Sequence, residues 1–223
     1  MPDSMILSVL DTAQHEVMLF AAAGLVLGGI DDLAIDIIYL VRQIWKRLFI
    51  YTRHERMNAG TLPLSLSSDP LAIFVPAWQE SAVIGHMLRA ASGKWQKENY
   101  RIFVGVYPND PATLQAVLQI SRENPKIVAT VHDRNGPTTK ADCLNSVWRA
   151  MVEHEGITAT RFKGIVMHDA EDVVHADELR LLSVMIDRFD LVQLPVLPLV
   201  SQQSRWVAGH YCDEFADPRC LLA

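Results

Sequence analysis

The chain has 223 residues, of which 50% are hydrophobic, and its mean hydropathy is +0.13. This composition excludes an intrinsically disordered chain and is more apolar than a purely water-soluble globule requires. The 26 acidic and 20 basic residues give a formal net charge of -6, which argues against a protein that binds nucleic acid through its phosphates. The three cysteines have no CxxC spacing, so neither a disulfide framework nor a four-cysteine zinc site is available.

A long hydrophobic segment follows an N-terminal tail, which we place at residues 1–15. Residues 17–30 contain no charged side chain, and the apolar sequence resumes after Asp31 and Asp32. A helix that spans a bilayer needs about 20 apolar residues. We therefore predict that residues 16–56 form a membrane helix together with a basic amphipathic helix.

Two arrangements of this segment remain open. In the first, one helix spans the bilayer and its aspartates lie near an interface or face a partner helix. In the second, residues 17–30 span a thin stretch and the remainder lies on the membrane surface. A stripe at helical spacing favours the second arrangement: Leu33, Ile37, Leu40, Val41, Ile44 and Leu48. A buried core helix of a soluble protein is the alternative to both.

The basic residues of this region all follow the apolar run. Arg42, Lys46, Arg47 and Arg53 lie after it, and no basic side chain precedes it. The positive-inside rule then predicts an external N-terminus and a cytoplasmic position for the rest of the chain. Residues 57–70 mix Gly, Pro, Ser and Asn without periodicity and are predicted to be a linker.

From residue 71 onward, strand and helix patterns alternate, which predicts an α/β domain with a mostly parallel sheet and helices on both faces. The expected strands are residues 71–75, 101–107, 126–131, 164–167 and 191–197. The expected helices are residues 81–91, 112–122, 138–155 and 177–188. In such sheets, ligands bind at the carboxyl ends of the strands.

Acidic residues follow several of these strands. Asp110 follows the second strand, where a helix cap would explain it equally well. Asp169, Glu171 and Asp172 follow the fourth strand, and three acids in four residues exceed what one cap needs. A hard divalent cation, bound between carboxylate and phosphate oxygens, would account for them.

Four segments in series resemble the motifs of the family 2 glycosyltransferases, including a membrane-bound branch of that family. They are PAWQE at 76–80, ND at 109–110, NGPTTKADCLN at 135–145 and HDAED at 168–172. The resemblance implies a GT-A fold, a nucleoside-diphosphate sugar donor and Mg2+ or Mn2+. The family's Asp-x-Asp motif is represented here by Asp169-Ala170-Glu171, in which Glu replaces the second Asp.

Carried over residue by residue, the resemblance implies donor-binding residues, metal ligands and an acceptor-side residue. The donor-binding residues would be Glu80, Asp110, Lys140, Asn145 and Asp169. The metal ligands would be Asp169, Glu171 and Asp172, and Gln193 would face the acceptor.

The implied reaction is inverting transfer of a hexosyl or N-acetylhexosaminyl group. The donor would be a UDP-sugar and the acceptor a glycan or a lipid-linked molecule. The site would be the bacterial inner membrane, with the catalytic domain cytoplasmic and an outer-membrane or secretion partner. The product would serve polysaccharide biosynthesis.

Inverting transfer also needs a general base, which in the family lies beyond the motifs quoted above. Asp213 is the candidate that this sequence offers, and we expect the domain at 71–223 to be incomplete at its C-terminus. Two alternatives therefore stay open. One is a catalytically incomplete donor-binding fragment or interaction subunit, and the other is a metal-dependent hydrolase.

Overall fold

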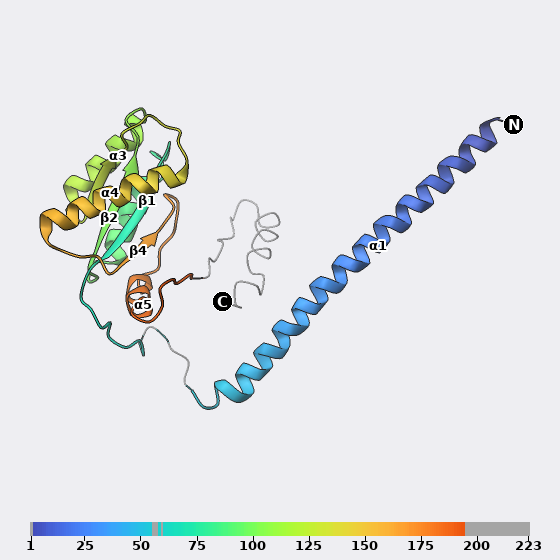
Figure 1. Ribbon diagram of the computed structural model, residues 1–223, viewed down its shortest axis with the longest axis horizontal. Coiled ribbons are helices and arrows are strands. Elements are labelled where there is room, and N and C mark those ends of the chain that lie inside the picture. Colours follow the sequence, from blue (N-terminus) through green and yellow to red (C-terminus); the bar gives the residue numbers. More distant parts are fainter. Residues whose placement is uncertain (1, 55–57, 59, 195–223) are drawn as a thin grey trace. The chain divides into compact units, whose positions relative to one another are not determined.

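The computed structural model describes residues 2–54, 58 and 60–194 (Figure 1). The chain divides into two compact units. Among the described residues, the first comprises 2–54 with 193–194, and the second comprises 58 and 60–192. Residues 191–194 are not in a strand, and the rest of the fifth strand predicted from the sequence lies outside the described residues.

The first unit contains one long helix, α1 (Pro2–Trp45), which continues into a π-helical turn, η1 (Lys46–Ile50). At 1.5 Å per residue its 44 residues extend for about 66 Å, roughly twice the hydrocarbon thickness of a bilayer. The helix passes without interruption through Asp31 and Asp32, and it includes residues 2–15, which we placed in a tail. This continuity corresponds to the first of the two arrangements considered above.

The apolar side chains of α1 are exposed along its length, Phe20 at 82% and Leu25 at 78%. Among the described residues, Leu10–Ile50 is the one helical segment long and apolar enough to cross a membrane, and none of it is buried. Exposed apolar side chains in such number are typical of a helix covered by lipid or by another helix.

The second unit is built on a parallel four-stranded sheet with strand order β3-β2-β1-β4. The strands are β1 (Leu71–Pro76), β2 (Tyr100–Val106), β3 (Ile127–Val131) and β4 (Gly164–Met167). The helices are α2 (Ile84–Lys94), α3 (Pro111–Glu123), α4 (Lys140–Thr158) and α5 (Glu178–Met185). The prediction of an α/β fold with a mostly parallel sheet is confirmed.

Alternate residues of the central strand β1 enter different cores, because successive strand side chains point to opposite faces. Leu71, Ile73 and Val75 belong to a large core that also contains residues of α2, α3 and α5. Ala72 and Phe74 belong to a smaller core with residues of α4. Both faces of the sheet are therefore covered, as a parallel sheet requires.

Candidate functional site

The carboxyl ends of the strands frame a cavity of about 350 Å³. Four of the residues predicted from the sequence line it: Glu80, Lys140, Asp169 and Glu171. They come from the loop after β1, the first turn of α4 and the loop after β4, and β1 lies between β2 and β4 in the sheet. The fold thus brings together side chains that are up to 91 positions apart in the sequence. The rest of the lining is Pro76, Ala77, Trp78, Tyr107, Thr138 and Cys143.

Lys140 supplies the positive charge of this cavity. It is the first residue of α4, whose N-terminus is capped by Thr139 Oγ1, which accepts a hydrogen bond from the Asp142 amide at 3.1 Å. The ammonium group of Lys140 pairs with Asp169 across the cavity, and both side chains remain more than half exposed. An exposed pair of this kind contributes little to folding, so both groups stay available to a ligand.

The loop after β4 presents two carboxylates to the cavity, and its third carboxylate bonds within the loop. Asp172 Oδ2 accepts a hydrogen bond from the Asp169 amide at 2.9 Å and lies 3.0 Å from His168 Nδ1. Asp172 is outside the cavity lining, whereas Asp169 and Glu171 are part of it. Within this loop, Asp172 therefore stabilises the backbone, whereas Asp169 and Glu171 face the cavity.

His168 lies between two carboxylates, with a side chain that is only 9% exposed. Its Nε2 lies 3.0 Å from Glu178 Oε1, and its Nδ1 faces Asp172. Burial by itself would lower the pKa of His168, but Glu178 and Asp172 outweigh it, and the pKa is raised. The imidazolium form is thus favoured, with Nδ1 hydrogen-bonded to Asp172 and Nε2 at ion-pair distance from Glu178.

The Asp110 side chain caps the N-terminus of α3 and also bonds to the loop after β1. One carboxylate oxygen accepts from the Thr113 amide at 3.3 Å and the other from the Gln79 amide at 2.6 Å. Burial would raise its pKa, but the hydrogen bonds from Thr113 and Gln79 prevail and lower it. These bonds also hold Gln79 at a φ of 60°, a left-handed conformation that is costly for a non-glycine residue.

The other predicted site residues are not gathered at the cavity. Asn145 is exposed on α4, outside the lining. Gln193 is exposed and belongs to the first compact unit. Asp213 lies outside the described residues.

An aromatic wall completes the cavity, and sequence reasoning did not assign it to the site. Trp78 meets Tyr107 edge to face at 5.1 Å, and Tyr107 stacks on the buried His132 at 5.1 Å. Gly136 packs against the Trp78 ring so closely that a Cβ there would lie 2.4 Å from a ring carbon. The position of Trp78 between Pro76 and Glu80 in the first motif was the available signal.

Asn109 fixes the glycine that supports this wall. Its side-chain amide donates to the Gly136 carbonyl and accepts from the Gly136 amide, each at 2.7 Å. The loop after β2 thereby holds the loop after β3. The buried Cys143 thiol also lines the cavity, and burial raises its pKa, so it remains a neutral thiol rather than a nucleophile.

The donor atoms at the cavity fit a divalent cation that is shared with a ligand. Within residues 2–54, 58 and 60–194, no three His, Cys, Asp or Glu side chains are placed to hold an ion by themselves. Asp169 and Glu171 nevertheless both line the cavity. Mg2+ is characteristically held by one or two carboxylates together with substrate phosphates, and this arrangement matches that donor set.

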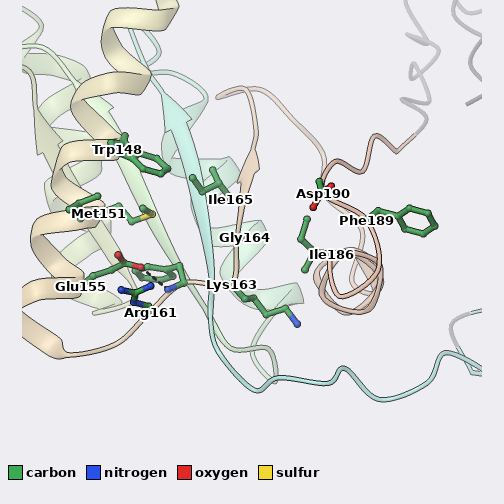
Figure 2. Close-up of a pocket in the computed structure, with 12 residues that line it drawn as sticks. Trp148, Met151, Glu155, Arg161, Lys163, Gly164, Ile165, Ile186, Phe189 and Asp190 are labelled. Carbon is green, nitrogen blue, oxygen red and sulfur yellow. Dashed lines mark hydrogen bonds between the residues drawn. The ribbon is translucent and has the colours of Figure 1, made fainter.

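A second cavity, of about 560 Å³, lies between α4, β4 and the residues after α5 (Figure 2). Its lining combines apolar side chains, among them Trp148, Met151, Ile165 and Phe189, with the charged residues Glu155, Arg161, Lys163 and Asp190. None of the residues predicted for donor or metal binding lines it. Size alone does not identify a site: both cavities have charged residues in their lining, but the smaller one lies at the carboxyl ends of the strands and holds residues of the sequence motifs.

The family whose description is "Glycosyltransferase like family 2" matches residues 69–219, about two thirds of the chain. The chain belongs to this family, which confirms the resemblance inferred from the four motifs. The match begins just before β1 and contains all the cavity residues.

Two curated relatives share 42% identity with the chain over 191 residues. They are Bacteriophage adsorption protein B of Escherichia coli (strain K12) and Bacteriophage N4 adsorption protein B of Escherichia coli O157:H7. The alignment covers 86% of this chain and 26% of each relative, so the chain spans about a quarter of the length of these proteins.

Among solved structures, a mannosyltransferase, PcManGT from Pyrobaculum calidifontis in complex with GDP-Man and Mn2+, aligns with 78% of this chain and 49% of its own. Its TM-score is 0.38 and its identity 18%. At that score the likeness carries no argument about this chain.

Proposed function

We propose that the chain is the donor-binding part of a membrane-anchored glycosyltransferase that transfers a sugar from a nucleoside-diphosphate sugar. The observation that carries this proposal is the convergence of Glu80, Lys140, Asp169 and Glu171 on one cavity at the carboxyl ends of the strands. A UDP-sugar is the donor that we would test first. The acceptor would be a glycan or a lipid-linked molecule.

The charges around the cavity support a diphosphate ligand. Lys140 and the capped N-terminus of α4 both favour negative charge at the same side of the cavity. A diphosphate would replace Asp169 as the partner of Lys140 or share the lysine with it. Trp78 offers aromatic surface for a nucleobase, a contact worth about 1–3 kcal/mol per base.

Asp169 and Glu171 are the residues that we propose to hold Mg2+ or Mn2+, with Asp172 retained as support for their loop. A bound divalent cation would neutralise charge on the departing diphosphate. Glu80 would bind the hydroxyls of the ribose or the base by accepting hydrogen bonds. Lys140 would orient the phosphates through its ammonium protons.

Transfer with inversion also requires a group that removes the proton of the acceptor hydroxyl. We keep Asp213 as a candidate for that role and Gln193 for the acceptor side. The exposed apolar surface of α1 and the basic residues Arg42 and Lys46 after its uncharged run support an inner-membrane anchor with a cytoplasmic donor domain. A partner at the cell surface is part of the same proposal.

The test is calorimetric titration of UDP and several UDP-sugars into the full chain in detergent, with Mn2+ and with a chelator. We expect binding that depends on Mn2+ and that weakens at least about tenfold in Glu171→Ala, equivalent to about 1.4 kcal/mol. Glu153→Ala is the matched control, because Glu153 is exposed on α4 and lies outside the cavity. Its affinity should equal that of the native chain.

The alternatives give different results in the same experiment. A folded chain that binds no nucleotide under either condition would overturn the proposal and favour an interaction subunit. Release of free sugar or phosphate from the donor, without any acceptor, would favour a metal-dependent hydrolase. Equal binding by Glu171→Ala and the native chain would remove Glu171 from the metal site.

A further inference from the structure

One end of α5 is fastened to the segment that precedes the sheet. We call residues 62–67 the strap; they belong to the stretch predicted as a linker. Ser65 Oγ and the Leu66 amide each lie 2.7 Å from Asp187 Oδ2, just after α5. In the first turn of α5, near its opposite end, Arg180 donates to the Leu62 carbonyl at 3.2 Å, so the strap contacts the helix at both ends.

A nearly buried ion pair joins the start of β4 to the residues just after α5. Lys163 Nζ lies 3.0 Å from Asp187 Oδ1, and the two side chains are 7% and 12% exposed. Figure 2 shows the Lys163 side chain extending from the start of β4 toward α5. Because removing one partner would leave a nearly buried charge unpaired, the strap, β4 and the end of α5 are held in one arrangement.

The other end of α5 is fastened to the loop that carries the cavity acids. Glu178, the first residue of α5, lies 3.0 Å from His168 Nε2 through Oε1 and accepts from the His175 amide through Oε2 at 3.2 Å. His168 Nδ1 faces Asp172, which accepts from the Asp169 amide. His168 also packs beside Trp95, with ring centroids 5.8 Å apart.

We propose that His168 and Glu178 are positioning residues for the loop at 168–172, and that the strap sets the position of α5 and, through α5, of that loop. The importance of this loop for donor binding rests on the proposed function. The coupling itself is a property of the described contacts. It would make the site responsive to strain on the segment that joins the α/β unit to the N-terminal helix.

The loop needs this outside support because of its place in the sheet. β4 is short and pairs with β1 alone among the described strands. Its residues are only half buried, with Ile165 at 38% exposed and Met167 at 66%. The sheet therefore holds the loop from one side, and α5 supplies the other.

The first experiment is hydrogen exchange at the amides of residues 168–172 in the full chain, in detergent and without donor. Ser65→Ala removes the hydroxyl that bridges Lys163 and Asp187, and we expect exchange in the loop to become at least about fivefold faster. Ser65→Thr keeps the hydroxyl and should restore native exchange. Ser121→Ala, which removes a hydroxyl bond to the Leu118 carbonyl on α3, is the matched control and should leave the loop unchanged.

Arg180→Ala is a second, milder variant that removes only the bond to the strap carbonyl, and it should move exchange in the same direction. If neither Ser65→Ala nor Arg180→Ala changes exchange in the loop, or if Ser121→Ala changes it equally, the coupling is absent and the inference is wrong.

The second experiment is a double-mutant cycle on UDP-sugar affinity, with Ser65→Ala and His168→Asn. Coupled residues give changes in binding free energy that do not add, whereas independent distant sites add. We expect the double variant to bind no more weakly than His168→Asn alone. Additive effects would overturn the inference. A chain that shows the exchange effect but binds no nucleotide would keep the inference and remove the proposed function.

Discussion

Two loops of the α/β unit have similar acidic sequences, but their side chains make different contacts in the structure. The loop after β2 ends in Asn109 and Asp110, and both side chains bond to neighbouring loops. The loop after β4 directs Asp169 and Glu171 at the cavity. Residue type and position after a strand are therefore insufficient to identify a ligand-binding acid.

The position of each strand in the sheet explains the difference. β2 lies between β1 and β3, so the loop after it meets the loops of both neighbours. Backbone amides of those loops need acceptors, and Asp110 and Asn109 supply them. β4 has a single neighbour among the described strands, so its loop has fewer backbone groups of other loops to satisfy, and Asp169 and Glu171 face the cavity.

The largest effect that this comparison predicts is a loss of folding stability when Asp110 is replaced. Asp110→Ala leaves the Gln79 and Thr113 amides without their acceptor and removes the cap of α3. We expect the free energy of unfolding to fall by about 2–4 kcal/mol, measured by chemical denaturation. Glu171→Ala should change it by less than about 0.5 kcal/mol. A stable Asp110→Ala variant with weakened donor binding would reverse the roles assigned to the two loops.

A smaller effect is expected from the loop after β3. Gly136→Ala places a Cβ against the Trp78 ring, so the ring has to move. We expect a loss of about 1–3 kcal/mol in the free energy of unfolding, together with weaker UDP-sugar binding.

Gly156→Ala is the control, because a Cβ at that exposed helical position meets no atom within 4 Å. It should raise stability by about 0.5–1 kcal/mol. If Gly136→Ala keeps native stability and affinity, the wall formed by Trp78 is not part of the site.

Much of this architecture follows from local pattern. The four described strands appear within two residues of their predicted positions, because each is a short apolar run bounded by turn residues. Glu80, Lys140, Asp169 and Glu171 could be placed at one edge because parallel strands bring their carboxyl ends together. The continuity of α1 was open, because Asp31 and Asp32 could equally end a helix or lie on its surface.

The remaining features depend on tertiary contacts that have no local signature. The roles of Asp110 and Asp172 are decided by which backbone amides come near them. Trp78 lines the cavity because its ring packs against Gly136 and Tyr107. The strap resembled a linker because its contacts are to residues about 120 positions away in the sequence.

The last prediction concerns Asp187, an acid that follows neither loop but is bonded much as Asp110 is. Hydrogen bonds from the Leu66 amide, Ser65 and Lys163 lower its pKa to about 2. Because this is below the ordinary value of about 3.9 for an unfolded Asp, the ionised carboxylate stabilises the folded chain. That contribution is complete above about pH 5 and is lost as the pH falls through about 4 toward 2.

The test compares the native chain with Asp187→Asn in denaturation curves between pH 2 and pH 7. We expect the native chain to be more stable above about pH 5, and the difference to shrink progressively as the pH falls below about 4. A difference that stays constant down to pH 2 would contradict the bonding assigned to Asp187. A shrinking difference would show that the hydrogen bonds to the ionised Asp187 carboxylate stabilise the folded chain.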